Sequence, residues 1–279
     1  MFKKIHDARD LEALLRAWHG KRATTNFFLT EDIYLSMIKQ CAVMRFENGC
    51  YLIFEKQNHY DFYFFLQKGT LPVAVPQMPK PLVLEQVCLE RKGQEPKASF
   101  WEAVGFVPYL ERKRLMMPLQ DGISATSAVQ FATSSQADTI LEMMQNMFEP
   151  YTSALPTKKE LLASIVKKEV LVAQEHEQLL GFLRYGAEKK VSVLWQIAVS
   201  KQARGKGIGR MLVKHWIWQV KDDALRCQLW VRTDNQAAQR MYEMLGFLPD
   251  GRIAPVMIKK EEGNVENGKF IENFSGNQT

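Results

Sequence analysis

The chain has 279 residues, 46% of them hydrophobic and 24% charged, which is typical of a globular protein long enough for two domains. Lysine and arginine exceed aspartate and glutamate (37 against 31, net +6), yet no block of five or six cations occurs, so the charge suits an anionic small ligand and does not indicate nucleic acid. No apolar run approaches the roughly 20 residues that a membrane helix needs, and the first residues show no signal-like core, so we expect a cytoplasmic protein without membrane contact.

The first 118 residues show two helical patterns followed by a pair of strands. The predicted elements are helices over Asp10–Trp18 and Glu31–Lys39 and strands over Cys50–Phe54 and Tyr60–Leu66. Between Gly69 and Glu90 the sequence contains four prolines and no Gly-x-Gly pair. At Gly105-Phe106 we expect a helix to end, because glycine accepts the left-handed conformation and phenylalanine packs back on the last turn.

A linker is predicted over residues 119–127, where Asp121-Gly122 and small hydroxyl residues replace the apolar periodicity. Residues 128–262 then predict a second domain, and the polar residues 263–279 a disordered tail. The second domain is expected to begin with a strand over Val129–Ala132, a helix begun by a Ser135-x-x-Asp138 capping box and stopped by Pro150, and a helix begun by Thr157-x-x-Glu160. A hairpin over Val170–Ala173 and Leu179–Tyr185 and a strand over Val191–Ser200 come next. The last expected elements are a helix over Ile208–Val220, a strand over Gln228–Val231, a helix from Asn235 and a closing strand over Pro255–Ile258. This order predicts an α+β fold, a mixed β-sheet flanked by helices.

The segment Gln202-Ala203-Arg204-Gly205-Lys206-Gly207-Ile208-Gly209 lies between a predicted strand and a predicted helix. Glycines at such a turn allow backbone N–H groups to approach phosphate oxygens, and the helix adds the positive end of its dipole. Its spacing matches neither the dinucleotide fingerprint nor the P-loop. The segment therefore predicts a phosphate-binding loop of another kind.

The loop resembles the Gln/Arg-x-x-Gly-x-Gly/Ala pyrophosphate loop of the GCN5-related N-acetyltransferases (GNAT family) through Gln202, Gly205 and Gly207. Further along the chain, the run from Asn235 to Phe247 resembles the last helix of that family, with its Asn, its Tyr and its Gly-Phe end. The run Ser99–Pro108 echoes this helix when Trp101 is set opposite Tyr242. The chain is therefore similar to a tandem GNAT protein whose first copy, residues 1–118, has lost its phosphate loop.

The resemblance implies acetyl-CoA as acyl donor and assigns roles to individual residues. The residues expected to contact the cofactor are Ile197, Ala198, Val199, Gln202, Arg204, Gly205, Lys206, Gly207, Ile208, Gly209 and Asn235. Ile197 and Val199 would pair through their backbones with the pantetheine arm, although their side chains also read as core. For Arg204 and Lys206 a solvated position is an equally good interpretation, and for Asn235 helix capping alone is sufficient.

Tyr242 is the expected general acid, because the family places a tyrosine there to protonate the departing thiolate. A core aromatic is the alternative. The general base is less clear: many family members carry a Glu on the strand before the loop, where this chain has Trp195-Gln196. Glu149 is the candidate, beside Tyr151 on the expected acceptor wall; a solvated helix-end charge and a water chain are its alternatives. We expect no metal site, because the four cysteines show no metal-ligand spacing.

The predicted function is transfer of an acetyl group from acetyl-CoA to a primary amine of a small molecule, by direct attack in a ternary complex. Two alternatives stay open. One is a CoA-binding sensor that keeps the fold without the chemistry, and the other is an enzyme that modifies a protein lysine or N-terminus. The sequence does not identify the acceptor or the oligomeric state.

Overall fold

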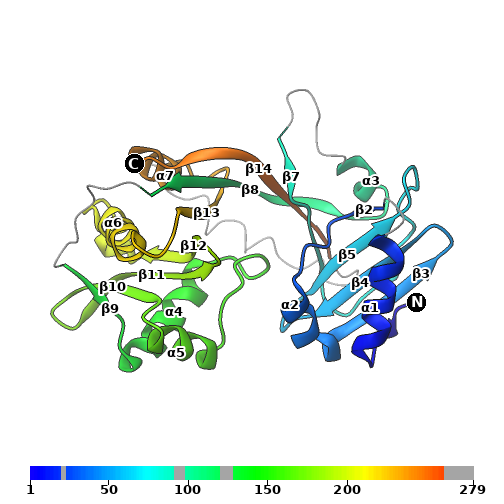
Figure 1. The fold of residues 1–279 in the computed structure, drawn as a ribbon, viewed down its shortest axis with the longest axis horizontal. Helices are drawn as coiled ribbons and strands as arrows, with labels where there is room; N and C mark the ends of the chain where they lie inside the picture. Colours follow the sequence, from blue (N-terminus) through cyan, green and yellow to red (C-terminus); the bar gives the residue numbers. More distant parts are fainter. Residues whose placement is uncertain (20–22, 91–97, 120–127, 261–279) are drawn as a thin grey trace. The chain divides into compact units, whose positions relative to one another are not determined.

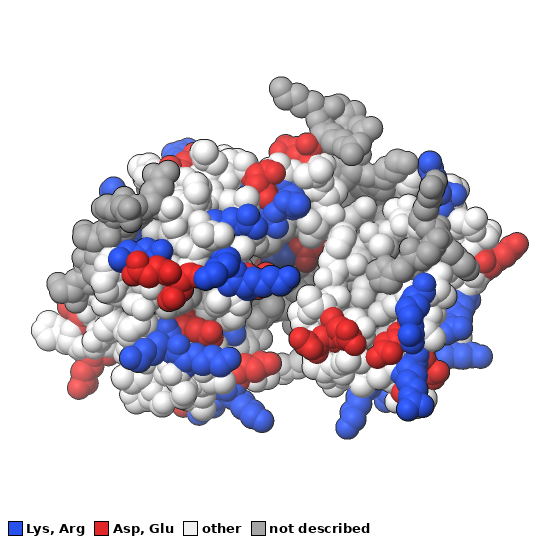
Figure 2. All heavy atoms as spheres, viewed as in Figure 1, with Lys and Arg blue, Asp and Glu red and all other residues white. Residues whose placement is uncertain are grey.

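A computed structural model describes residues 1–19, 23–90, 98–119 and 128–260. The chain divides into two compact units (Figure 1). Unit 1 comprises Met1–Leu84, Lys97–Pro108 and Met257–Thr279, and unit 2 comprises Glu85–Pro96 and Tyr109–Val256. None of the helices in these described ranges is long and apolar enough to cross a bilayer. Lys and Arg alternate with Asp and Glu on the face shown in Figure 2, as the mixed charge of the sequence predicts.

Unit 2 has the predicted α+β architecture, a mixed sheet with helices on both faces. Its elements are β7 (Cys88–Leu89), β8 (Val107–Pro118), β9 (Val129–Phe131), η2 (Ser134–Gln136), α4 (Ala137–Met147), α5 (Lys158–Val166), β10 (Val170–Glu175), β11 (Gln178–Glu188), β12 (Val191–Val199), η3 (Lys201–Ala203), α6 (Ile208–Val220), β13 (Arg226–Arg232), α7 (Gln236–Met244) and β14 (Leu248–Lys259). Its strands follow the order β14-β8-β13-β12-β11-β10-β9. All pairs in this unit with a defined register are antiparallel except β12–β13, which is parallel.

The two faces of the unit 2 sheet bury separate cores, as the period-two alternation of the strands requires. One core lies under α6 and α7 and contains Leu212, Trp216 and Leu229; the other lies under α4 and α5 and contains Ile140 and Phe182. In Figure 1, α6 and the α4–α5 pair lie on opposite sides of strands β10 to β12.

Unit 1 repeats this plan with fewer helices. Its elements are β1 (Lys3–Lys4), α1 (Ala8–His19), β2 (Thr24–Thr25), α2 (Glu31–Ser36), η1 (Ile38–Gln40), β3 (Cys41–Phe46), β4 (Gly49–Glu55), β5 (Tyr60–Leu66), β6 (Leu82–Glu85) and α3 (Ala98–Glu102). The strand order is β1-β3-β4-β5-β6, with β5 and β6 parallel at Tyr60–Leu82. As in unit 2, one face is covered by the first helix of the unit and the other by the helix that ends in Gly-Phe.

The helix ends at Gly105-Phe106 and Gly246-Phe247 have the same geometry. Each glycine is left-handed, with φ of +91° and +93°. The amide of each phenylalanine donates to the carbonyl of Trp101 or Tyr242 at 3.0 Å, and each phenylalanine ring lies 5.7 Å from the ring of that residue. The predicted alignment of Trp101 with Tyr242 therefore describes two equivalent positions.

The boundary between the units differs from the sequence-based boundary at residue 118. Strand β8 follows α3 in the chain, but Arg112–Pro118 pairs with the whole of β13, and Leu115 and Met117 lie in the unit 2 core. Conversely, β14 ends in unit 1, where Met257 is buried. The pattern of loop and linker residues marks where a strand ends but not which sheet it joins.

Several predicted elements need correction. The second helix is shorter than Glu31–Lys39, the closing strand is longer than Pro255–Ile258, and β3 was not predicted. The capping box before α4 is formed by Thr133 and Gln136, so a 3₁₀ turn precedes the helix. The predicted tail 263–279 and most of the predicted linker lie outside the described residues.

Candidate functional site

The predicted phosphate loop leads from β12 through η3 into α6. Gly205 and Gly207 are left-handed, with φ of +77° and +78°, and a Cβ on either would meet no atom within 4 Å. Gly207 is the N-cap of α6 and no side chain caps the helix, so its first N–H groups depend on another acceptor. The open space and the helix N-terminus together fit a pyrophosphate.

The side chains of the loop divide into anchors and exposed groups. Ala203 and Ile208 are buried in the core under α6. Gln202, Arg204 and Lys206 are exposed. The side chains of Arg204 and Lys206 are therefore free to reach an anion, and a contact of either with a phosphate stays a prediction. Ser200, directly before the loop, has a buried hydroxyl without a hydrogen-bond partner among the described residues.

Strands β12 and β13 separate beside this loop. Their parallel pairing runs from Val191 to Leu194 on β12 and stops there, whereas β12 continues its pairing with β11 as far as Val199. A β-bulge at Trp195 coincides with the separation, because the β11 partner shifts from Leu194 to Gln196 between adjacent residues. The backbone from Gln196 to Val199 thus has one edge open for an extended ligand.

The three β12 residues expected at the cofactor lie on this edge. Ala198 is buried under α4 and α5, while Ile197 and Val199 are half-buried against the core under α6. Substituting their side chains would mainly disturb packing. All three residues lie beyond Leu194, the last β12 residue paired with β13, and a backbone contact with the pantetheine arm stays a prediction.

Helix α7 places Asn235 and Tyr242. The Asn235 side chain accepts from the Ala238 amide at 3.1 Å, so its capping role is confirmed and a cofactor contact stays a prediction. Tyr242 is 3% exposed, and burial raises the pKa of its phenol. α7 is close to the loop helix, because a Cβ on Gly209 would lie 3.2 Å from the Met241 sulfur.

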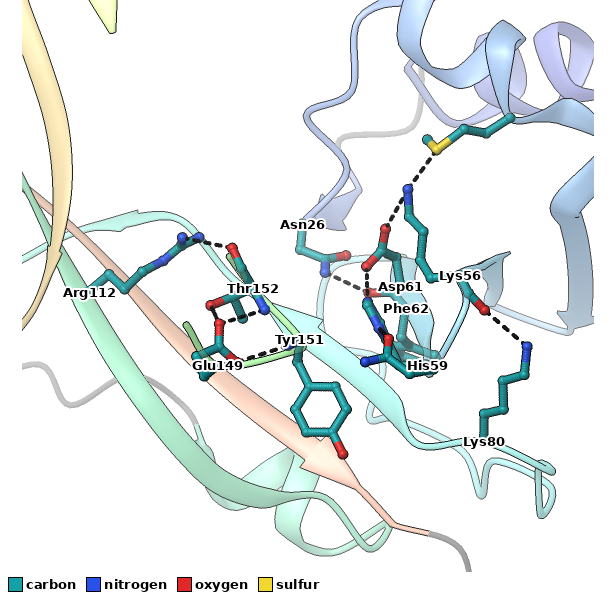
Figure 3. A network of polar contacts seen from close by, with 12 residues as sticks. Asn26, Lys56, His59, Asp61, Phe62, Lys80, Arg112, Glu149, Tyr151 and Thr152 are labelled. Atoms are coloured by element: carbon teal, nitrogen blue, oxygen red, sulfur yellow. Dashed lines mark hydrogen bonds and ion pairs between the residues drawn. The ribbon is translucent and has the colours of Figure 1, made fainter. Parts of the chain in front are cut away.

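Glu149 is buried, so its interpretation as a solvated helix-end charge is wrong. It is 7% exposed and accepts hydrogen bonds from the Tyr151 amide at 2.9 Å, the Thr152 amide at 2.7 Å and the Thr152 hydroxyl (Figure 3). It also accepts from the Ser153 hydroxyl at 3.0 Å. The Tyr109 hydroxyl also bonds to it, and burial with this carboxylate raises the pKa of Tyr109. With so many donors, Glu149 fixes the turn that follows α4.

Gln196 belongs to the pair Trp195-Gln196, the place on the strand where the resemblance would put a Glu. It is 2% exposed, and its amide donates to the carbonyls of Ser153 at 2.8 Å and Ala154 at 3.3 Å. From β8, Arg112 donates to the neighbouring Thr152 carbonyl at 3.2 Å (Figure 3). The turn is therefore held from within by Glu149 and from two strands by Gln196 and Arg112.

The sequence analysis missed a group of residues on β8 and β13. On the face opposite α6, Arg112 lies across from Arg232 and Arg114 across from Trp230. The charged run Glu111-Arg112-Lys113-Arg114 was the available signal, but because all four positions are charged it does not show which of them share a face of the strand. Their pairing with β13 is not readable from sequence, because β8 belongs to the other half of the chain.

Comparison with known proteins agrees with the fold. The acetyltransferase (GNAT) family matches residues 138–247. Mycothiol acetyltransferase of Rhodococcus jostii is 30% identical over 82 residues, 27% of each chain, and L-2,4-diaminobutyric acid acetyltransferase of Vibrio cholerae is 29% identical over 89 residues, 30% of this chain and 51% of the relative.

A solved GNAT-family acetyltransferase from Colwellia psychrerythraea superposes with a TM-score of 0.57 at 14% identity, covering 93% of this chain and 100% of that one. Because both units are needed for this coverage, the similarity of fold extends over both units. The curated relatives are matched over only about a quarter to a half of their length. The family match and the fold agree that residues 138–247 form an acetyltransferase (GNAT) domain.

Proposed function

We propose that unit 2 transfers an acetyl group from acetyl-CoA to a primary amine of a small molecule, by direct attack in a ternary complex. The observation that carries the proposal is the open backbone edge Gln196–Val199 beside the left-handed glycines Gly205 and Gly207. An extended amide arm followed by a pyrophosphate matches this succession of an open strand edge and a helix N-terminus.

Tyr242 is proposed as the acid that protonates the departing thiolate. Its raised pKa keeps the phenol protonated at neutral pH. Its ring packs on Phe247 at 5.7 Å, so the side chain is held rather than mobile. A fixed, protonated hydroxyl supplies a proton without reorganisation of the site.

Proton removal from the amine is assigned to a chain of water molecules. Gln196 is an amide and has no basic site, and the oxygens of Glu149 are occupied by backbone and hydroxyl donors. We assign to Gln196 and Glu149 the shared role of holding the turn at Thr152–Ala154, which would position the acceptor. The two relatives named above carry the names of small-molecule acetyltransferases, which supports a small amine over a protein.

A CoA-binding sensor is the second candidate, and the observation that favours it is the amide of Gln196 in place of a carboxylate. Calorimetric titration of the full chain with acetyl-CoA, followed by thiol release with a panel of primary amines, separates the two. We expect one site per chain and turnover with at least one amine. Binding without turnover indicates the sensor, and no binding rejects the proposed cofactor site.

A further inference from the structure

A charged surface on β8 and β13 borders the point where β12 and β13 separate. Trp230 directly follows Leu229, the last β13 residue paired with β12, and Arg232 lies two residues beyond. Across from them on β8 are Arg114 and Arg112. We call these four residues the arginine face. It lies on the side of the sheet where Arg112 and Gln196 hold the turn after α4.

Each arginine of this face is anchored by a carboxylate of unit 2. The pairs are Arg112 with Glu85, Arg114 with Asp250 through its Nε at 2.8 Å, and Arg232 with Asp234 through its Nε at 2.9 Å. The guanidinium carbons of Arg112 and Arg114 lie 5.8 Å and 5.9 Å from the centre of the Trp230 ring. Fixed guanidiniums around one aromatic ring form a preorganised set of donors.

One feature of the arginine face is unfavourable as it stands. The Nε–H of Arg112 is buried and has no hydrogen-bond acceptor among the described residues. A buried donor without an acceptor costs free energy. Arg112 lies directly across from Arg232, and the charge of each is paired with a carboxylate, Glu85 or Asp234.

We propose that the acceptor amine carries a carboxylate, and that Arg112 and Arg232 bind this carboxylate beside Trp230. The inference rests on the proposed function, since it names the acceptor class of the same site. Arginine presents a planar fork that matches a carboxylate, which lysine does not. The position beside the strand separation places this group next to the amine that would be acetylated.

The test uses the full chain, acetyl-CoA and pairs of amines that differ only in the carboxylate: L-ornithine with putrescine, L-lysine with cadaverine, and β-alanine with ethylamine, with O-phosphoethanolamine as a phosphate control. Thiol release gives kcat/KM for each. We expect the acid of at least one pair to exceed its partner by about 10-fold or more, as a charged hydrogen bond would give. Equal or better turnover of the amines without a carboxylate, or of the phosphate, overturns the inference while the acetyltransferase proposal stands.

Variants separate recognition from folding. In R232Q we expect KM for the preferred acid to rise about 10-fold or more, with kcat and the KM of its decarboxylated partner within about 3-fold. R112K keeps the charge but loses the fork, and we expect the same split. The control is R226Q, at the exposed start of β13 across from Pro118, which should change neither value. An equal rise in KM for both amines shows a merely structural role and contradicts the inference.

If no amine is acetylated although acetyl-CoA binds, the proposed transfer fails and the carboxylate site is judged by binding. Calorimetric titration of the CoA-bound chain with N-acetyl-ornithine, N-acetyl-lysine and N-acetyl-β-alanine should then show saturable binding that R232Q weakens. Failure of all three to bind overturns the inference independently.

Discussion

Strands β5 and β12 hold equivalent places in the two units, and their free edges differ. Each begins with a short parallel pairing to the next strand, at Tyr60–Leu82 and Val191–Arg226. Beyond this parallel pairing, no described strand pairs with the edge of β12, whereas the edge of β5 pairs with a strand of the same unit. Strand β2 pairs with Phe65 and Leu66 of β5.

Asn26 completes the closure of the β5 edge. Its side chain is 2% exposed and donates to the Phe62 carbonyl at 3.0 Å (Figure 3). It also accepts from the Phe64 amide at 2.8 Å. A primary amide thus satisfies the backbone groups that a pantetheine amide would meet on the other strand. No helix follows β5 before β6 either, whereas α6 follows β12. The two units thus share a strand arrangement, and in unit 1 the edge beyond the parallel pairing is closed by residues of the same unit.

Removing β8 tests the other side of the comparison and should have the largest effect. A fragment of residues 119–279 leaves Arg226–Arg232 without its β8 partners and removes Leu115 and Met117 from the core. Each lost core side chain costs about 2–5 kcal/mol, against a total stability of about 5–15 kcal/mol. We expect no cooperative thermal transition by circular dichroism. The full-length chain serves as the control, and a folded, acetyl-CoA-binding 119–279 fragment would contradict this reading.

The equivalent positions Tyr242 and Trp101 should differ in chemistry. Tyr242→Phe keeps the ring that packs on Phe247 and loses the proton donor, so we expect kcat to fall about 100-fold with the affinity for acetyl-CoA unchanged. Trp101→Phe should lower only the thermal midpoint, because Trp101 is a core residue of unit 1. A Tyr242→Phe enzyme within 3-fold of the parent kcat would remove the tyrosine from the mechanism.

Asn26→Ala tests whether the closed edge of β5 only stabilises unit 1 or also blocks a second acetyl-CoA site. The substitution leaves the Phe62 carbonyl and the Phe64 amide unpaired, at a cost of about 1–3 kcal/mol in the free energy of unfolding. Denaturant titration measures this loss. Calorimetry should still find one acetyl-CoA per chain; a second site would mean that unit 1 retains a cofactor groove behind its own strand.

Gly207→Ala and Gly69→Ala form a matched pair, one in each unit. Both glycines are left-handed, with φ of +78° and +87°, and neither has an atom within 4 Å of a built Cβ. Each substitution should cost about 1–2 kcal/mol of stability because of the backbone conformation. Only Gly207→Ala should lower the affinity for acetyl-CoA, by about 10-fold, since Gly69 lies outside the loop. Equal affinities in the two variants would show that the N-terminus of α6 does not bind the cofactor.

The smallest predicted effect is alkaline. Burial raises the pKa of Tyr242 above the ordinary value of a tyrosine, about 10, so its contribution to stability is complete well below pH 10 and declines as the pH rises toward the folded-state value. At pH 10.5 the parent should have lost about 0.8 kcal/mol through this group, and Tyr242→Phe should lack that loss. Paired urea titrations at pH 8 and 10.5 measure it, and an identical pH response would place the phenol in contact with solvent.

The sequence predicted most of unit 2 because its local signals are strong. Glycines that require positive φ mark both the loop and the helix ends, and the Thr157-x-x-Glu160 capping box begins α5 as predicted. The loop and the last helix were found by motif. The residues assigned to them lie together around the separation of β12 and β13, although their contacts with a cofactor remain predictions.

What the sequence could not give is the set of long-range pairings. The burial of Glu149 depends on a turn that folds back on its own carboxylate, and nothing in Met147–Ser153 distinguishes this from a solvated end. The arginine face depends on the register of β8 against β13, which joins residues more than 100 positions apart along the chain. Alternation identifies the charged face of a strand but never its neighbour.

Strand β8 also has a consequence for the gene. Deleting the segment for residues 1–118 would remove the strand beside β13 together with most of unit 1. Substitutions from Arg112 to Met117 are therefore constrained by the pairing and the core of unit 2, although these residues follow unit 1 in the chain.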